Sequence, residues 1–443
     1  MKNMFSNLIG NRLGLRGLTF FSLGLFSTTS CLAFVIAGHI LSFYTITLFL
    51  AFVYLLLDKR IKVSVTHNKS YRLFLLWTLF GLLSACFGFV FFINDDEWRS
   101  AAVSYIPKLL LYFLLFYLLC KNVNRVTYVS LLLKGIMFGI AVNCAWATVD
   151  ALIFYASGYS ITNQIFRSYI LAADIRYESL SLVIGNIIRS AGLNADPANI
   201  GMFAPILASY GLYSKTRWMY LLSILGIFAS VSIVAFAGVL IVTLVYMLSS
   251  KKIFLIGIFT MILLGLGITS LSLSDDGVYG QMIGAVSDRL EEKSESDTSD
   301  KDNARAMYWK NFLPAVINTP TALVIGTGYG TASYAYINGG YVNRKGAYDP
   351  EQTYFSNYFD LGLWGFLAFL MLHLFVLKQS HKKRQNLDFL RSFSGIEGVM
   401  IAFMGYHYTI YSVSMLIIIA GAIMEQIYFC YNFDKDSYVN TQV

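Results

Sequence analysis

Charged residues are scarce in this sequence: Asp, Glu, Lys and Arg together make up 13% of its 443 positions. A soluble domain carries about 25%, so the shortfall argues against an ordinary soluble enzyme. Hydrophobic residues account for 57% of the chain. Apolar runs of about 20 residues recur between charged clusters, and each can cross a bilayer as a helix. They lack the alternation in segments of about 10 residues that a membrane barrel requires. The sequence therefore predicts an all-α polytopic membrane protein.

Cysteine and histidine are also rare, with five of each. All five cysteines fall in or at the ends of the apolar runs, so we expect no structural disulfide. The histidines are scattered without the spacing of a ligand set, so we expect no bound metal. We expect no other cofactor either. The apolar stretch after Arg16 extends for about 40 residues, too long for the hydrophobic part of a signal peptide. We interpret it as two uncleaved spans.

Hydropathy predicts about twelve membrane helices within a single membrane-embedded domain, residues 1–443. Lys and Arg cluster in the short connections on one side of this path, which the positive-inside rule assigns, with both termini, to the cytoplasm. The net charge of +8 is explained by these cations and does not indicate a nucleic-acid partner. The helices are expected at residues 18–37, 40–57, 72–93, 101–120, 128–156, 198–214, 218–232, 234–250, 253–271, 352–377, 394–412 and 413–431.

Two long segments, 157–197 and 272–351, lie on the opposite, external side. Long loops in compact proteins are often functional. Within the second, Arg289–Asn303 is polar and low in complexity, which is typical of a mobile stretch. The following residues, Ala304–Ile317, combine hydrophobic and basic side chains in the pattern of a short helix on a membrane surface.

Arginines in the external segments are unusual, because topogenic cations belong inside. Arg189 and Arg305 adjoin sequence that looks ordered, and Arg176 and Arg344 lie in the same two segments. Arginine binds phosphate through paired hydrogen bonds, so the cluster indicates an anionic ligand. The competing interpretations are a salt bridge, contact with lipid headgroups, or solvated charge on a translocated loop.

Three motifs in these segments resemble the bacterial superfamily of O-antigen polymerases and O-antigen ligases. The first is an arginine followed by a glycine and a turn entering a helix. The second is an arginine and a tryptophan followed by a proline and a Gly-x-Gly turn. The third is a polar residue and an aromatic entering a helix with Gly-x-x-Gly. The matching residues are Arg189, Gly192, Asp196, Pro197 and Asn199; Arg305, Trp309, Pro320, Gly326 and Gly328; and Glu351, Tyr354, Gly362 and Gly365.

The resemblance implies a membrane glycosyltransferase of the GT-C type in the bacterial inner membrane, with 157–197 and 272–351 as periplasmic loops. Polymerases of this superfamily join oligosaccharide repeats carried on undecaprenyl pyrophosphate, and ligases move the finished chain to lipid A core. Ligases usually have His-Asn where this chain has Glu351-Gln352, which favours a polymerase. The implied partners are lipid-linked oligosaccharides, the bilayer and a chain-length regulator.

The resemblance also assigns roles to residues. Arg189 and Arg305 are expected to stabilise the leaving pyrophosphate. Glu351 is the candidate base for the attacking hydroxyl or orients the acceptor; the competing interpretation is an acid that favours the helix dipole at a helix start. For Asp196 and Asp349 helix capping is a competing role, because each precedes a proline at a helix start. The residues expected to bind substrate are Arg176, Arg344, Asp196, Asn199, Tyr354 and Asp349.

Several features leave alternatives open. Asp360 either hydrogen-bonds within the helix bundle or lines a cavity, and Asp150 is equally ambiguous. The GTGYG run at Gly326–Gly330 is either a tight turn, which its context favours, or a phosphate cradle. Functions besides an O-antigen polymerase are a ligase, a capsule or exopolysaccharide polymerase, a non-enzymatic scaffold, and a lipid-oligosaccharide flippase. The absence of internal repeats disfavours the last of these.

Overall fold

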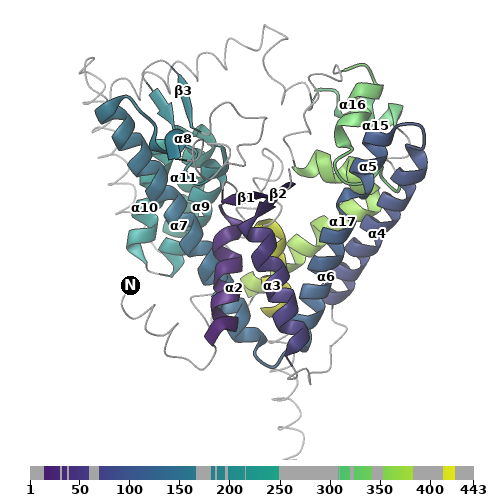
Figure 1. The fold of residues 1–443 in the computed structure, drawn as a ribbon, viewed down its shortest axis with the longest axis horizontal. Helices are drawn as coiled ribbons and strands as arrows, with labels where there is room; N and C mark the ends of the chain where they lie inside the picture. Colours follow the sequence, from purple (N-terminus) through teal and green to yellow (C-terminus); the bar gives the residue numbers. More distant parts are fainter. Residues whose placement is uncertain are drawn as a thin grey trace, which may run out of the picture. The chain divides into compact units, whose positions relative to one another are not determined.

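A computed structural model describes two compact units of the chain (Figure 1). The first unit comprises Met1–Phe49, Leu131–Asp300 and Arg384–Val399, and the second comprises Leu50–Ser130, Lys301–Lys383 and Met400–Val443. The single domain expected from the sequence stays a prediction. The described residues are 14–29, 32–36, 39–58, 69–165, 181–184, 187–194, 198–214, 216–248, 308, 310–319, 324–341, 353–382 and 413–424.

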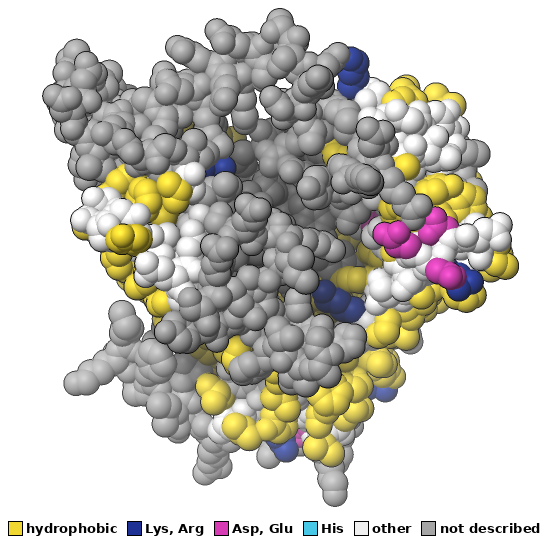
Figure 2. All heavy atoms as spheres, turned by 45° about the horizontal axis from the view of Figure 1, so that its top comes forward, with side chains coloured by type: hydrophobic (Ala, Val, Ile, Leu, Met, Phe, Trp, Pro, Cys, Tyr) yellow, Lys and Arg dark blue, Asp and Glu magenta, His cyan; other side chains and the backbone are white. Residues whose placement is uncertain are grey.

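Four helices in the described part of the chain are long and apolar enough to cross a membrane: Lys69–Phe91, Asp96–Lys121, Arg125–Ser157 and Tyr354–Lys378. Shorter apolar helices accompany them, and large hydrophobic side chains such as Leu152, 64% exposed, lie on the outside. Hydrophobic side chains cover much of the described surface in Figure 2. The chain is therefore a multi-pass membrane protein. The expected spans 253–271 and 394–412, and the stretch Arg289–Asn303, lie outside the described residues.

The helix expected at 18–37 is wrong in its C-terminal half. Helix α2 (Gly14–Ser27) ends early, and β1 (Ala33–Ile36) and β2 (His39–Ser42) form an antiparallel hairpin before α3 (Phe43–Leu57). The Thr28 hydroxyl donates to the carbonyl oxygen of Leu25 at 2.7 Å. Such local bonds compete with helix continuation, and the β-branched residues that follow favour strands.

The long helix α7 (Arg125–Ser157) belongs to the first unit from Leu131 onward, and α2 approaches it closely there. A Cβ atom on Gly135 of α7 would lie 2.1 Å from the carbonyl oxygen of Phe21, so only glycine permits this contact. The segment 157–197 contains α8 (Ile161–Ile165) and the antiparallel hairpin of β3 (Leu182–Ile184) and β4 (Ile187–Arg189). Three helices follow, in which α9 packs against both others: α9 (Ala198–Tyr213), α10 (Arg217–Ser230) and α11 (Ile233–Leu248).

In the second unit α4 (Lys69–Phe91) packs against both α6 (Ile106–Lys121) and α17 (Thr353–Lys382), as Figure 1 shows. The helix expected at 101–120 starts earlier, because Asp95 caps α5 (Asp96–Ser104) by accepting the backbone N–H of Trp98. Pro107 follows the junction of α5 and α6 and lacks a backbone N–H, which favours a break there.

The segment after Arg305 is helical, as expected, over α15 (Phe312–Asn318). Its Ala315 and Val316 are buried in a cluster with α16 (Ala332–Asn338) and the start of α17. On its other side Leu313 and Ile317 are 64% and 66% exposed. The helix is thus amphipathic, and its placement on the membrane surface stays a prediction.

Candidate functional site

The structure describes three of the nine expected site residues. Arg189 and Asn199 belong to the first unit, and Tyr354 belongs to the second. The other expected residues lie outside the described part of the chain: Arg176, Asp196, Arg305, Arg344, Asp349 and Glu351.

Arg189 is the last residue of β4 and is half-buried. Its Nε donates to the carbonyl oxygen of Ser230, 3.4 Å away, at the end of α10. The next backbone N–H, of Ser190, donates to the carbonyl oxygen of Ala229 at 2.9 Å. Helix C-terminal carbonyls carry partial negative charge, so they attract and orient a cation. The end of α10 thus fixes both the backbone beside Arg189 and the root of its guanidinium.

Asp150 of α7 holds the chain on either side of the β3–β4 hairpin. Its Oδ2 accepts the hydroxyl protons of Ser181 at 2.8 Å and Ser190 at 2.7 Å. Its Oδ1 accepts the Ser160 hydroxyl at 2.9 Å and the Thr162 backbone N–H at 3.0 Å. The carboxylate is fully buried. Of the roles open to Asp150, the structure shows a hydrogen-bonding anchor for Ser160, Thr162, Ser181 and Ser190.

Asn143, two helical turns before Asp150, anchors the residues after the arginine. Its Oδ1 accepts the Leu193 backbone N–H at 3.0 Å and the Asn194 side-chain amide at 2.7 Å. Its own amide donates to the carbonyl oxygen of Thr28 at 2.9 Å. Sequence reasoning missed Asn143. The available signal was its spacing of seven residues from Asp150, which places two polar side chains on one face of an apolar helix.

Gly192 forms the sharp part of this segment, with a φ of 63°. A Cβ atom there would lie 2.9 Å from the carbonyl oxygen of Asn143. The positive φ favours glycine because other residues are strained in the left-handed region. The contact with Asn143 favours glycine because it leaves no room for a Cβ atom. The turn from Arg189 to Asn194 is thus closely packed on α7. Asn199 lies five residues further on, half-buried in the first turn of α9.

In the second unit, the glycine-rich run is a tight turn, and the backbone N–H groups of Thr327, Gly328 and Gly330 donate to the protein itself. Gly326, Gly328 and Gly330 all have positive φ values, of 83°, 95° and 78°. The N–H of Thr327 donates to the carbonyl oxygen of Phe359, and that of Gly328 to the carbonyl oxygen of Asp360, each at 3.0 Å. The tight turn favoured by the sequence is confirmed, and these two N–H groups are directed at α17.

Asp360 secures the same turn with its side chain. Its carboxylate accepts the N–H groups of Gly330 and Thr331, both at 3.2 Å. The Ser84 hydroxyl of α4 donates to the Asp360 carbonyl oxygen and accepts the Gly328 N–H at 2.9 Å. Asp360 is 5% exposed. Of the two expectations for Asp360, hydrogen bonding within the bundle is confirmed.

These contacts depend on a break in α17 at Gly362, two residues after Asp360, where φ is 69° and ψ is 178°. The break frees the carbonyls of Phe359 and Asp360 to accept from the turn. A Cβ atom on Gly326 would lie 2.4 Å from the Gly362 nitrogen, so the two glycines let the backbones touch. Tyr354, in the first turn of α17, is half-buried and packs edge-to-face on Phe366, with ring centroids 5.9 Å apart.

Lys108 is a cation within the span Asp96–Lys121 that sequence reasoning did not select. Its Nζ lies 5.3 Å from the centre of the Tyr105 ring. Tyr105 in turn packs on Tyr329 of the glycine-rich turn, at 4.3 Å between centroids. A lysine inside an apolar run was the available signal. In the same part of the chain, no group of three or more His, Cys, Asp or Glu side chains is placed to hold a metal ion.

A family model described as O-antigen ligase matches residues 218–370. The matched segment begins in α10 and ends in α17, so it contains the glycine-rich turn, Asp360 and the break at Gly362. It also contains Arg305, Arg344, Glu351 and Tyr354, whereas Arg189 and Asn199 precede it. No curated protein matches the chain. The matched segment covers about a third of the chain. Together with the motifs, it supports a relationship to the superfamily of O-antigen polymerases and O-antigen ligases, whose members are membrane enzymes of the glycosyltransferase and ligase type.

Proposed function

We propose that this protein is an O-antigen polymerase, joining oligosaccharide repeats carried on undecaprenyl pyrophosphate at the periplasmic face of the inner membrane. The observation that carries the choice of polymerase is Glu351-Gln352, which stands where ligases have His-Asn. The anchoring of Arg189 supports an anion site, because a cation can stabilise a leaving group only if it is held in place beforehand.

The reaction needs an acceptor hydroxyl, a glycosyl donor and a sink for negative charge. The acceptor oxygen forms a bond to the anomeric carbon of the donor while the bond from that carbon to the pyrophosphate oxygen breaks. The hydroxyl proton passes to Glu351, and the pyrophosphate leaves with the bonding electrons. Arg189 and Arg305 stabilise the charge that develops on it. Attack opposite the leaving group inverts the anomeric configuration, and no metal or cofactor is required.

The remaining expected residues bind substrate in this proposal. Arg176 and Arg344 add positive charge for the phosphates, and Asp349, Asp196 and Asn199 offer hydrogen bonds to sugar hydroxyls. Tyr354 offers a ring face to a sugar. Both loops, 157–197 and 272–351, lie in the periplasm and both termini in the cytoplasm, as the distribution of Lys and Arg favours. A chain-length regulator is the proposed protein partner.

Substitutions of the three catalytic candidates test this proposal. Arg189→Ala, Arg305→Ala and Glu351→Gln are each expected to lower polymerisation by about 100-fold or more, since losing one electrostatic or proton-transfer group costs about that much. The measurement is the glycan ladder formed from lipid-linked repeats by equal amounts of detergent-purified protein. Arg217→Ala is the matched control, because Arg217 is exposed at the start of α10. Full activity in any of the three variants removes that residue from the site.

The second candidate is an O-antigen ligase, and the description of the matching family model favours it. The two reactions share a lipid-pyrophosphate donor and differ in the acceptor. Supplying purified lipid A core beside lipid-linked repeats separates them. Transfer to lipid A core without any lengthening of lipid-linked glycan establishes the ligase and refutes the polymerase.

A further inference from the structure

We infer that Asp150 and Ser190 are positioning residues for Arg189, and that the Asp150 carboxylate sets where the guanidinium meets the phosphate of the lipid-linked donor. This inference rests on the proposed function, in which Arg189 contacts the pyrophosphate. It adds a role for two residues outside the matched segment 218–370. Neither residue touches substrate in this inference, since both act through the backbone of Arg189.

The two oxygens of Asp150 serve different parts of the first unit. Oδ1 accepts from Ser160 and Thr162, which lie just before and within α8. Oδ2 accepts from Ser181 before β3 and from Ser190 directly after β4. Only Oδ2 therefore reaches the chain that carries Arg189. Within the described part of the chain all four partners are neutral, so the contacts fix geometry without pairing the charge.

Ser190 is held from three directions. Its hydroxyl donates to Asp150 and also accepts the Gly192 N–H at 3.3 Å, while its own N–H donates to the carbonyl oxygen of Ala229 at 2.9 Å. The Ser181 hydroxyl, on the same carboxylate oxygen, accepts the Ala191 N–H at 3.2 Å. Arg189 is joined to Ser190 by one peptide bond, so this network restricts the position of its backbone.

Such a network matters because displacing a catalytic group by about 1 Å can lower the rate about 100-fold. Loss of the Ser190 hydroxyl removes the direct bond between Asp150 and the residue next to Arg189. Loss of the Ser160 hydroxyl removes its bond to Oδ1 and the bond that it accepts from the Asn163 N–H, but it leaves both bonds to Oδ2 in place. Both serines are buried, at 0% and 7% exposure. Comparing the Ser190→Ala and Ser160→Ala variants therefore separates an effect on the position of Arg189 from the general effect of removing one hydrogen bond to a buried carboxylate.

The experiment compares Ser190→Ala with Ser160→Ala in the full chain, purified in detergent. The substrate is lipid-linked repeats extracted from cells that lack polymerase activity, and kcat, KM and melting temperature are measured. We expect similar falls in melting temperature for both variants, and a fall in kcat of about 10-fold or more for Ser190→Ala alone. If Ser190→Ala does not fold, Ser181→Ala makes the same comparison. In an Arg189→Lys background Ser190→Ala should cause a smaller further loss, because coupled sites are not additive.

Equal kcat values for Ser190→Ala and Ser160→Ala overturn the inference. The inference is also overturned if Ser190→Ala lowers kcat by the same factor in the Arg189→Lys background as in the wild type. Failure of the proposed function is recognised separately, by Arg189→Ala. If that variant remains fully active, both proposals fall. If Arg189→Ala is inactive while Ser190→Ala and Ser160→Ala have equal kcat values, the proposed anion site is retained and Asp150 is a structural residue only.

Discussion

Replacing Asp360 with alanine removes the two hydrogen bonds that its carboxylate accepts from Gly330 and Thr331. The two N–H groups are affected differently, because Gly330 is exposed and Thr331 is fully buried. The Gly330 N–H can bond to water instead, so its loss costs about 0.5–1.5 kcal/mol. The Thr331 N–H is left buried without a partner, at about 1–3 kcal/mol. The sum predicts that the second unit loses about 1.5–4.5 kcal/mol of stability.

The assay uses Cys120, which is buried in α6 of the same unit. In a chain with Cys120 as its only cysteine, a thiol reagent labels it when the unit opens, in proportion to the open population. Each 1.4 kcal/mol changes that population tenfold, so Asp360→Ala should speed labelling roughly 10- to 1,600-fold. The cysteines replaced by alanine for this purpose are Cys31, Cys86, Cys144 and Cys430.

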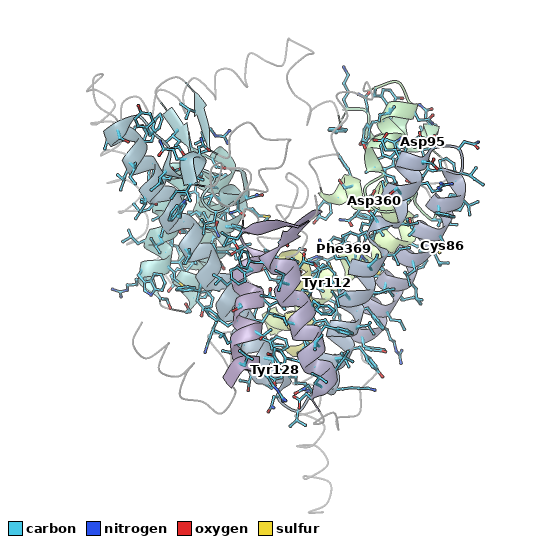
Figure 3. All side chains as sticks on the ribbon, in the orientation of Figure 1. Cys86, Asp95, Tyr112, Tyr128, Asp360 and Phe369 are labelled. Atoms are coloured by element: carbon cyan, nitrogen blue, oxygen red, sulfur yellow. The ribbon has the colours of Figure 1, made fainter. Side chains whose placement is uncertain are left out.

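Asp95→Ala is the matched control, since Asp95 also accepts a backbone N–H in the second unit but caps the start of α5 (Figure 3). Removing a helix cap costs about 1 kcal/mol, or roughly fivefold in labelling. If Asp360→Ala labels no faster than Asp95→Ala, the backbone bonds of Thr327 and Gly328 are enough to hold the turn. The role assigned to the Asp360 carboxylate is then wrong.

The remaining predictions concern the glycine-rich turn and the helix that follows it. Gly326 and Gly340 both have positive φ, but only Gly326 touches a neighbouring backbone. Alanine at either position adds strain of about 1–2 kcal/mol. Because Gly326→Ala also disrupts the backbone contact with Gly362, Cys120 should be labelled faster in Gly326→Ala than in Gly340→Ala. Equal labelling rates in the two variants would argue against that contact. Burial raises the pKa of Tyr336 above its usual 10.0. Its neutral form is therefore favoured in the folded state, so stability should fall as pH rises above about 10 and should fall less in Tyr336→Phe, as measured by melting temperature. An unchanged pH dependence in that variant would contradict this.

Hydropathy predicted the class of protein and several helices well. The expected spans 72–93, 128–156 and 198–214 correspond to α4, α7 and α9 within a few residues. Charged or strongly polar residues bound these apolar runs, and the cost of leaving backbone groups unpaired in lipid makes them helical. The hairpin at residues 33–42 was missed because it is as apolar as a span. The break at Gly362 was missed because it depends on contact with Gly326, which no local pattern reports.

The candidate site was predicted only in part. Arg189 was selected because an arginine in an external segment departs from the usual charge distribution. Its supports, Asn143 and Ser190, were missed, since their bonds join residues 40 to 50 positions apart in the chain. Asp150 and Asp360 were recognised as unusual, but their roles depend on which N–H and O–H groups the fold brings to them. Sequence thus indicates the charged groups, whereas tertiary packing decides which are held in place.

The central claim, that this protein polymerises lipid-linked repeats, is tested most directly by the purified chain in vesicles. The substrate is undecaprenyl-pyrophosphate-linked repeat units, and the readout is the length of the lipid-linked glycan together with release of undecaprenyl pyrophosphate. The account predicts a ladder of lengthening glycans, one pyrophosphate released for each bond formed, and loss of both in Arg189→Ala. Active wild-type preparations that release pyrophosphate without lengthening any lipid-linked glycan, or an Arg189→Ala variant that makes the full ladder, would contradict it.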